Sequence, residues 1–166
     1  MWALAHQIGI GINQSAFSAW ARGLANIYFW LIPAMQITHL LGMSVLMGSA
    51  GLYGLRLARG FDQPGIAASA GAGLLPWIIG AALVQSLTGV FMVLHRPTRA
   101  FDSLMFLPKL ALIVLGLSLF LVLLYKLKRQ TSERLSVMLR LAGASLFSCW
   151  IAIALAGRLI SFIRAG

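Results

Sequence analysis

Three ionisable side chains lie within long apolar stretches of the sequence: His39, Lys109 and Arg158. In the hydrocarbon of a membrane each of them needs a partner, because an unpaired charge there is costly. The three acidic residues of the chain all fall in polar breaks between the apolar stretches, so no carboxylate is available to Lys109 or Arg158. Either these two cations extend to the lipid headgroups, or they face the interior and contact an anionic ligand.

The imidazole of His39 has two interpretations. A neutral imidazole inside a membrane can hydrogen-bond across helices, and Gln36, Gln85 and Thr88 offer partners, as do several serines. Imidazole is also the usual axial ligand of haem iron and a good ligand for copper. Gly42, three residues further on, would let either another helix or a flat ligand approach closely.

Methionines share a helical face with His39. Met35 lies four residues before it, and Met43 and Met47 lie four and eight residues after it. Thioether and imidazole ligands together suit Cu(I), so this face is a candidate copper site. Packing is the alternative, because methionine fills irregular gaps between helices.

Two further histidines, His6 and His95, would form an outer metal site if the N-terminal segment folds over the end of the second apolar stretch. The alternative is that both are exposed loop histidines. The single cysteine, Cys149, excludes an intrachain disulfide and a CxxC site, and we expect it to be a small buried hydrophobic residue.

The elements that must position these residues are membrane spans. Of the 166 residues, 60% are hydrophobic and only 10% are charged. A bilayer core needs roughly 20 apolar residues in a helix, and four stretches meet that length. They cover residues 27–55, 66–94, 103–127 and 135–163. Short polar breaks separate them, so the sequence predicts an all-α fold: a single membrane domain, residues 1–166, built as an up-and-down four-helix bundle.

Residues 1–22 have a different pattern, in which apolar residues recur at helical spacing and polar residues occupy the other faces. This pattern predicts an N-terminal amphipathic helix that lies at the membrane interface. Pro33, Pro76 and Pro108 fall inside the predicted spans, where we expect each to kink its helix.

The net charge of +10 predicts the orientation of the chain. Seven basic residues flank the loops after the first and third spans, and four flank the opposite ends, so the first set should be cytoplasmic. We therefore expect a multi-pass protein of a bacterial inner membrane with both termini periplasmic. The basic residues form no long run, which argues against nucleic acid as a partner, and three scattered acids exclude a pair of catalytic carboxylates.

Four short motifs support a resemblance to known proteins. They are His39-Leu-Leu-Gly42, Leu-Tyr-Gly-Leu-Arg-Leu at residues 52–57, Phe106-Leu-Pro-Lys109, and a fourth span that runs from Trp150 to Gly157-Arg158. With these motifs the chain resembles the HemJ and CopD-like group of four-helix bacterial membrane proteins. Within that group it is most similar to an uncharacterised branch, a domain of unknown function.

In HemJ-type protoporphyrinogen oxidases a first-span histidine and a third-span lysine lie at a b-type haem. The resemblance therefore implies haem b inside the bundle, with His39 as axial ligand and Lys109 as second ligand or close neighbour. Arg158 would face a propionate. The tyrosine and histidine that typically follow the lysine helix are absent here, so oxidation of a porphyrinogen does not carry over.

Three functions remain open at this point. The first is electron transfer or oxidoreductase chemistry between the quinone pool and a periplasmic redox partner. The CopD resemblance suggests the second, which is copper handling through the methionine face. The third is a non-catalytic accessory subunit of a larger membrane complex. The expected partners are the lipid bilayer, a quinone, one of these protein partners and a second copy of the chain.

Overall fold

The computed structural model describes residues 2–60, 63–129 and 134–159. This part of the chain is helical and contains no strand, which confirms the predicted all-α class. Four helical segments are long and apolar enough to cross a membrane, as the sequence predicts, which fits a multi-pass membrane protein. They are Leu31–Arg59, Pro64–His95, Phe106–Arg129 and Val137–Leu159. Residues 160–163 of the fourth predicted span, and the acids Asp62 and Glu133, lie outside the described residues.

The first span is not one uniform α-helix. It consists of α3 (Leu31–Leu46), the π-helix η1 (Met47–Gly51) and α4 (Leu52–Arg59). Two glycines, which have low helix propensity, lie in η1, and the Ser49 hydroxyl donates to the carbonyl oxygen of Val45 at 2.6 Å. Such a hydroxyl competes for backbone carbonyls, and both features favour a widened turn. Gly60 ends α4 with a φ of 70°, a conformation that favours glycine.

The other three spans are α5 (Pro64–His95), α7 (Phe106–Arg129) and α8 (Val137–Leu159). Pro76 lies in the interior of α5. Pro33 and Pro108 instead occupy the first turns of α3 and α7. The backbone N–H of a first-turn residue has no partner within its helix, so a proline there removes no hydrogen bond and the kinks expected at these two positions have no cause.

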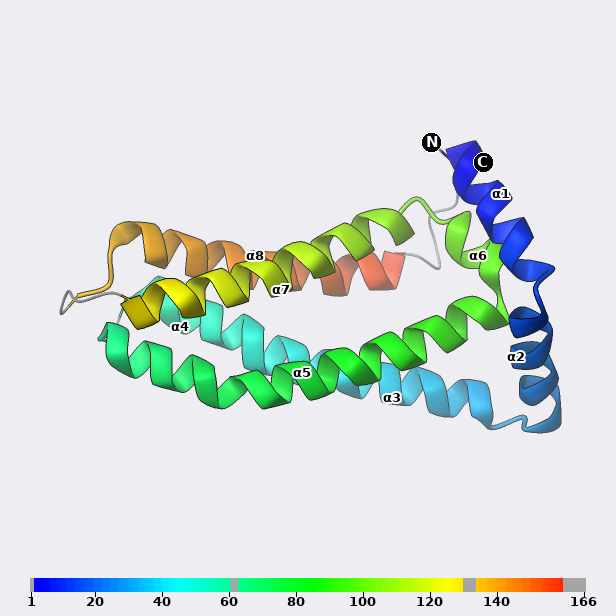
Figure 1. Ribbon diagram of the computed structural model, residues 1–166, viewed down its shortest axis with the longest axis horizontal. Coiled ribbons are helices and arrows are strands. Elements are labelled where there is room, and N and C mark those ends of the chain that lie inside the picture. Colours follow the sequence, from blue (N-terminus) through cyan, green and yellow to red (C-terminus); the bar gives the residue numbers. More distant parts are fainter. Residues whose placement is uncertain (1, 61–62, 130–133, 160–166) are drawn as a thin grey trace.

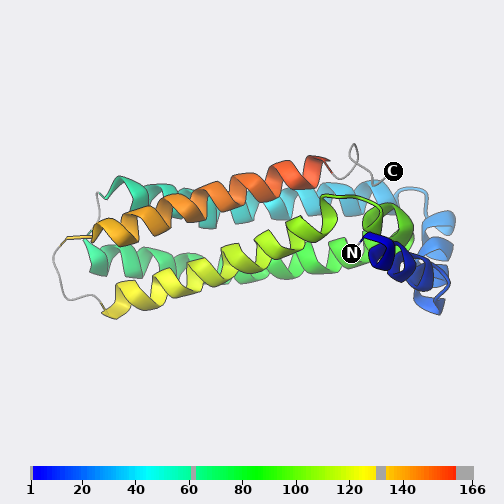
Figure 2. The same cartoon turned by 90° about the horizontal axis from the view of Figure 1, so that it is seen from above.

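The long helices lie side by side in two views at right angles (Figures 1 and 2). The helix α3 packs on α5, α7 packs on α8, and η1 and α4 pack on α8. The first span therefore packs mainly on α5 with its first half and mainly on α8 with its second. We call the two ends of the molecule the α2 end, where α1, α2 and α6 lie, and the α4 end (Figure 1).

At the α2 end the chain forms α1 (Trp2–Asn13) and α2 (Ala16–Ile27), which lie across the ends of the long helices (Figure 1). The single helix expected over residues 1–22 is thus divided. The break occurs at Ser15, whose hydroxyl oxygen accepts a hydrogen bond from the backbone N–H of Ser18 at 3.3 Å and caps α2. Helix α1 packs on the short helix α6 (Pro97–Phe101), and α2 packs on α5.

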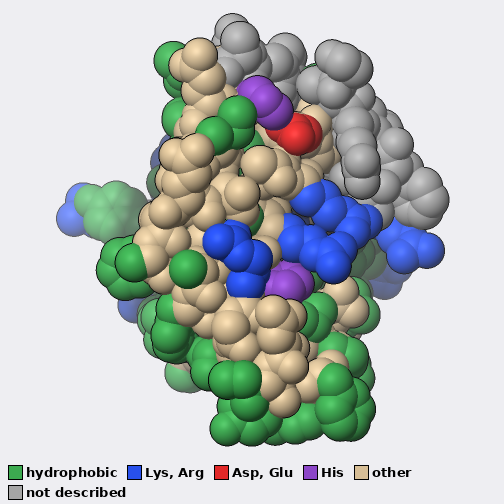
Figure 3. Space-filling model, turned by 90° about the vertical axis from the view of Figure 1, so that its right-hand side faces the viewer, with side chains coloured by type: hydrophobic (Ala, Val, Ile, Leu, Met, Phe, Trp, Pro, Cys, Tyr) green, Lys and Arg blue, Asp and Glu red, His purple; other side chains and the backbone are tan. Residues whose placement is uncertain are grey.

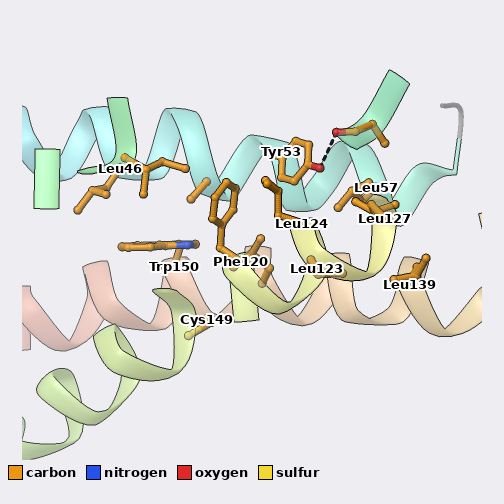
Figure 4. Close-up of a cluster of buried hydrophobic side chains, with 14 of the residues drawn as sticks. Leu46, Tyr53, Leu57, Phe120, Leu123, Leu124, Leu127, Leu139, Cys149 and Trp150 are labelled. Atoms are coloured by element: carbon orange, nitrogen blue, oxygen red, sulfur yellow. Dashed lines mark hydrogen bonds between the residues drawn. The ribbon is translucent and has the colours of Figure 1, made fainter. Parts of the chain in front are cut away.

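The buried core lies toward the α4 end (Figure 4). Tyr53 donates a hydrogen bond to the carbonyl oxygen of Ala67 at 2.7 Å, and its ring meets that of Phe120 edge to face at 5.6 Å between centroids. Helices α4 and α8 cross at two glycines: a Cβ atom on Gly54 would lie 2.7 Å from the carbonyl oxygen of Gly143. This half of the molecule is therefore closely packed backbone against backbone.

Candidate functional site

His39 of α3 faces α5. Its Nδ1 atom lies 2.8 Å from the hydroxyl oxygen of Thr88, which is buried, whereas the imidazole itself is half-buried. The cross-helix hydrogen bond that the sequence offers to His39 is thus confirmed, with Thr88 as the partner among the candidates. A second bond joins the same helices, because the amide nitrogen of Gln85 donates to the carbonyl oxygen of His39 at 2.8 Å.

The Thr88 hydroxyl also lies 2.7 Å from the carbonyl oxygen of Val84, one turn earlier in α5. A hydroxyl has one hydrogen to donate. When that hydrogen points to Val84, the hydroxyl accepts from His39 and the Nδ1 atom is the donor. The Nε2 atom of a neutral His39 then keeps its lone pair, which is the state in which imidazole binds a metal.

Glycines lie next to this pair of helices. A Cβ atom on Gly89 would lie 3.5 Å from the His39 ring, and one on Gly42 would lie 3.4 Å from the Gln85 side chain. Both distances are those of ordinary van der Waals contact. At these two glycines, no side chain lies between the backbone and the His39 ring or the Gln85 side chain. By contrast, a Cβ atom on Gly48, Gly73 or Gly80 would meet nothing within 4 Å among the described residues, so no close approach of these helices depends on them.

Lys109 lies in the first turn of α7. It is half-buried and lies against α8, where a Cβ atom on Gly157 would be 3.1 Å from its Nζ atom. The pairing of Lys109 with His39 at one ligand stays a prediction. We call His39, Gln85, Thr88, Gly89 and, for this predicted pairing, Lys109 the His39 site.

The His39 site lies outside the buried core, on its α2 side. On each of the four spans the core cluster stops before the site is reached: at Leu46 on α3, Ala81 on α5, Phe120 on α7 and Ile153 on α8. His39 and Lys109 precede the first core residue of their helices, and Thr88 follows the last one of α5. The polar groups thus occupy the less tightly packed half of the spans.

Arg158 lies in the last turn of α8, directly after Gly157, and is exposed. Its position next to the glycine that contacts Lys109 places the two cations of the sequence on adjoining parts of α7 and α8. Whether Arg158 reaches an anionic ligand stays a prediction.

The methionine face is half-buried throughout, at Met35, Met43 and Met47. Met43 packs against the core cluster, and the Cγ atom of Met47 lies 3.6 Å from a Cβ position on Gly51. These contacts are those of packing residues. In the described part of the chain no three His, Cys, Asp or Glu residues form a group that could hold a metal, and the copper site on methionines stays a prediction.

The two remaining histidines have different neighbours. The Nδ1 atom of His6 pairs with the carboxylate of Asp102 at 2.6 Å on the surface, a contact that joins α1 to the end of α6. His95 ends α5, and its Nδ1 atom is buried without a hydrogen-bond partner among the described residues. Cys149 is buried, as expected, and its thiol donates to the carbonyl oxygen of Leu112 at 3.3 Å.

No protein-family model, curated protein or solved structure matches this chain, so comparison with known proteins does not indicate its function. A proposal for the function therefore rests on the His39 site and on the four helices that are long and apolar enough to cross a membrane.

Sequence reasoning did not find Gly89, Gly157 or Asp102 as neighbours of the candidate residues. A signal existed for Gly89, because it directly follows Thr88 on the span that offers polar partners to His39. No such signal existed for Asp102 and His6, since they are 96 positions apart and meet only because α1 folds back onto α6.

Proposed function

We propose that this chain is a haem b-binding protein of a bacterial inner membrane and that it transfers electrons between the quinone pool and a periplasmic partner. The single observation that carries the proposal is the hydrogen bond between His39 and Thr88. A metal-binding histidine almost always donates its other ring N–H to a fixed acceptor, which sets the tautomer and orients the ring. His39 has this arrangement within an apolar span.

The charge and the packing of the surrounding residues support an anionic ligand. Gly89 and Gly157 let the His39 ring and the Lys109 side chain lie directly against the backbones of α5 and α8. The core packing ends before this region on all four spans. Haem b also carries two carboxylates, and among the described residues no acid supplies such a counter-ion to Lys109.

In this proposal each residue has a limited role. His39 would hold the haem iron through its Nε2 atom, and Thr88 would hold the ring in place. Lys109 would supply a second ligand or a positive charge near the propionates, and Arg158 would bind a propionate at the end of α8. When bound, haem supplies reversible one-electron oxidation and reduction, with a potential that depends on the axial ligands and on nearby charges.

The proposed topology is an up-and-down bundle with α1, α2 and both termini on the periplasmic side. Helices α1 and α2 lie across the ends of the spans, as an interfacial segment would (Figure 1). Large aromatic residues near this end are exposed, among them Trp20, Tyr28 and Trp30. Aromatic side chains of this kind are enriched at the membrane–water interface. The α4 end carries the basic last turns of α4 and α7, which favours a cytoplasmic location.

The test is the absorption spectrum of the full chain, purified in detergent from haem-replete cells, together with metal analysis. We expect a Soret band in the wild-type protein and its loss in His39→Ala, because the axial ligand is removed. His95→Ala is the matched control, since it removes a histidine from the end of α5 and should leave the band unchanged.

A wild-type protein without a Soret band would overturn the proposal. Copper bound in its place, and lost when Met43 and Met47 are both replaced by leucine, would support copper handling. Co-purification with other chains and no metal at all would instead indicate an accessory subunit.

A further inference from the structure

A basic hollow of about 480 Å³ lies at the α2 end, away from the His39 site. Its lining comes from α1, α2, the end of α5 and the start of α6. The residues that line it are Asn13, Arg22, Asn26, His95, Arg96, Thr98 and Arg99. None of these residues is acidic, and Figure 3 shows basic side chains gathered around a histidine on this face. We call this feature the arginine hollow.

Arg22 is held in a fixed orientation in the arginine hollow. Its guanidinium donates to the side-chain oxygen of Asn13 at 2.7 Å, to the carbonyl oxygen of the same residue at 3.1 Å and to the hydroxyl of Ser18 at 2.5 Å. Ser18 is fully buried and donates in turn to the carbonyl oxygen of Leu94 at 2.8 Å. A cation that neutral groups position in this way keeps its charge uncompensated.

The other two arginines have no charge partner within the described part of the chain. There, the guanidinium groups of Arg96 and Arg99 make neither an ion pair nor a hydrogen bond. The nearest described acid in sequence, Asp102, is paired with His6. Three like charges around one hollow repel each other, so an anion that enters it would relieve this repulsion as well as form charge-assisted hydrogen bonds.

His95 also lines the hollow. Its Nδ1 atom is buried without a partner in the described part of the chain, so this atom is closed to a ligand in the hollow. The arginine side chains therefore provide the recognition of an anion.

We infer that the arginine hollow binds a phosphate group. Arginine forks match phosphate oxygens in pairs, and a tetrahedral dianion or diester offers acceptors in several directions at once. The exposed aromatic residues Trp20, Tyr28 and Trp30 belong to the same end of the molecule, so the hollow lies at the depth of lipid headgroups in the proposed topology. The phosphate belongs either to a lipid headgroup or to a free phosphate compound in the aqueous phase.

The experiment measures binding to the full chain in an uncharged detergent, by titration calorimetry. The probes are dihexanoyl phosphatidic acid, inorganic phosphate and, as the uncharged comparison, dihexanoylglycerol. We expect Arg96→Gln/Arg99→Gln to bind the phosphorylated probe at least about tenfold more weakly than the wild type. The matched control is Lys126→Gln/Lys128→Gln, which removes two positive charges at the α4 end and should bind as the wild type does.

Phosphatidic acid bound without inorganic phosphate would identify a lipid headgroup site, and both bound equally would identify a site for free phosphate. The inference is overturned if the wild type binds neither phosphorylated probe, if it binds dihexanoylglycerol as tightly, or if the arginine double variant retains its affinity. An equal loss in the lysine control would also overturn it. Should the double variant not fold, Arg99→Gln alone serves, because Arg99 is exposed.

Discussion

A threonine makes His39 suitable as a ligand in this structure. When the Thr88 hydroxyl donates to Val84, the imidazole donates from Nδ1, and Nε2 remains the basic nitrogen. The same contact accounts for a neutral histidine in an apolar span without any metal. The hydrogen bond and the axial ligand are therefore compatible uses of the two ring nitrogens.

Thr88→Val tests this coupling, since it keeps the branched shape and removes the hydroxyl. We expect haem to bind about tenfold more weakly, because loss of the partner of a metal ligand typically lowers affinity by that amount or more. The measurement is the Soret absorbance per protein during a haem titration of the purified protein.

Thr38→Val is the control for Thr88→Val. Thr38 precedes His39 directly but is exposed, so the same chemical change there should leave haem binding unaltered. Unaltered binding in Thr88→Val would show that the threonine does not position the ring.

Only part of the His39 site could be predicted from the sequence. Helical spacing indicates which residues share a face, and the apolar context marks His39 and Lys109 as exceptional. Neither feature distinguishes Thr88 from Gln36 or a serine as the partner, because that choice depends on how α3 is rotated against α5. The arginine hollow could not be predicted from the sequence either, because Arg22 and Arg99 belong to different helices and line one hollow only in the folded chain.

At the scale of the elements, the contact of α4 with α8 depends on two glycines. A Cβ atom on Gly54 would lie 2.7 Å from the carbonyl oxygen of Gly143 and 2.9 Å from the backbone nitrogen of Phe147. Backbone atoms, unlike the end of a flexible side chain, cannot relieve such a contact by a rotamer change. Helices α4 and α8 would have to move apart, and this movement would disturb the packing around Tyr53.

Gly54→Ala should therefore lower the free energy of unfolding by about 1–3 kcal/mol, the usual cost of overpacking. The expected observation is a lower midpoint in thermal unfolding followed by circular dichroism in detergent. Gly80→Ala is the matched control, because a methyl group there meets nothing within 4 Å. An equal midpoint in both variants would contradict the close crossing.

The ends of the elements were less predictable than their number. Hydropathy identifies four spans because the apolar runs are long. It does not identify the break at Ser15, where a side-chain cap divides the N-terminal helix, or the wide turn of η1, which lies inside an apolar span. Local hydrogen bonds of Ser15 and Ser49 determine these features.

For the whole molecule, the proposed topology predicts which end of the chain meets the periplasm. Gln14 and Lys128 are exposed at the α2 end and the α4 end, and the native Cys149 is buried. In intact cells, a membrane-impermeant maleimide should label Gln14→Cys and leave Lys128→Cys unlabelled until the membrane is opened.

The unsubstituted chain serves as the control for background labelling at Cys149. The opposite pattern would reverse the orientation and place the arginine hollow at the cytoplasmic surface, without affecting the geometry of the His39 site.

The π-helix η1 has a consequence for how the first span can vary. It lets α3 present His39 to α5 while α4 presents Gly54 to α8, and successive α-helical residues are about 100° apart around the axis. A π-helical turn holds about one residue more than an α-helical turn, so loss of one residue here, such as the exposed Gly48, would restore α-helical geometry and leave Gly54 directed at Gly143. Loss of one residue elsewhere in α3 or α4 would instead turn Gly54 away from Gly143. The first span can thus lose a residue within η1 and still join the same helices.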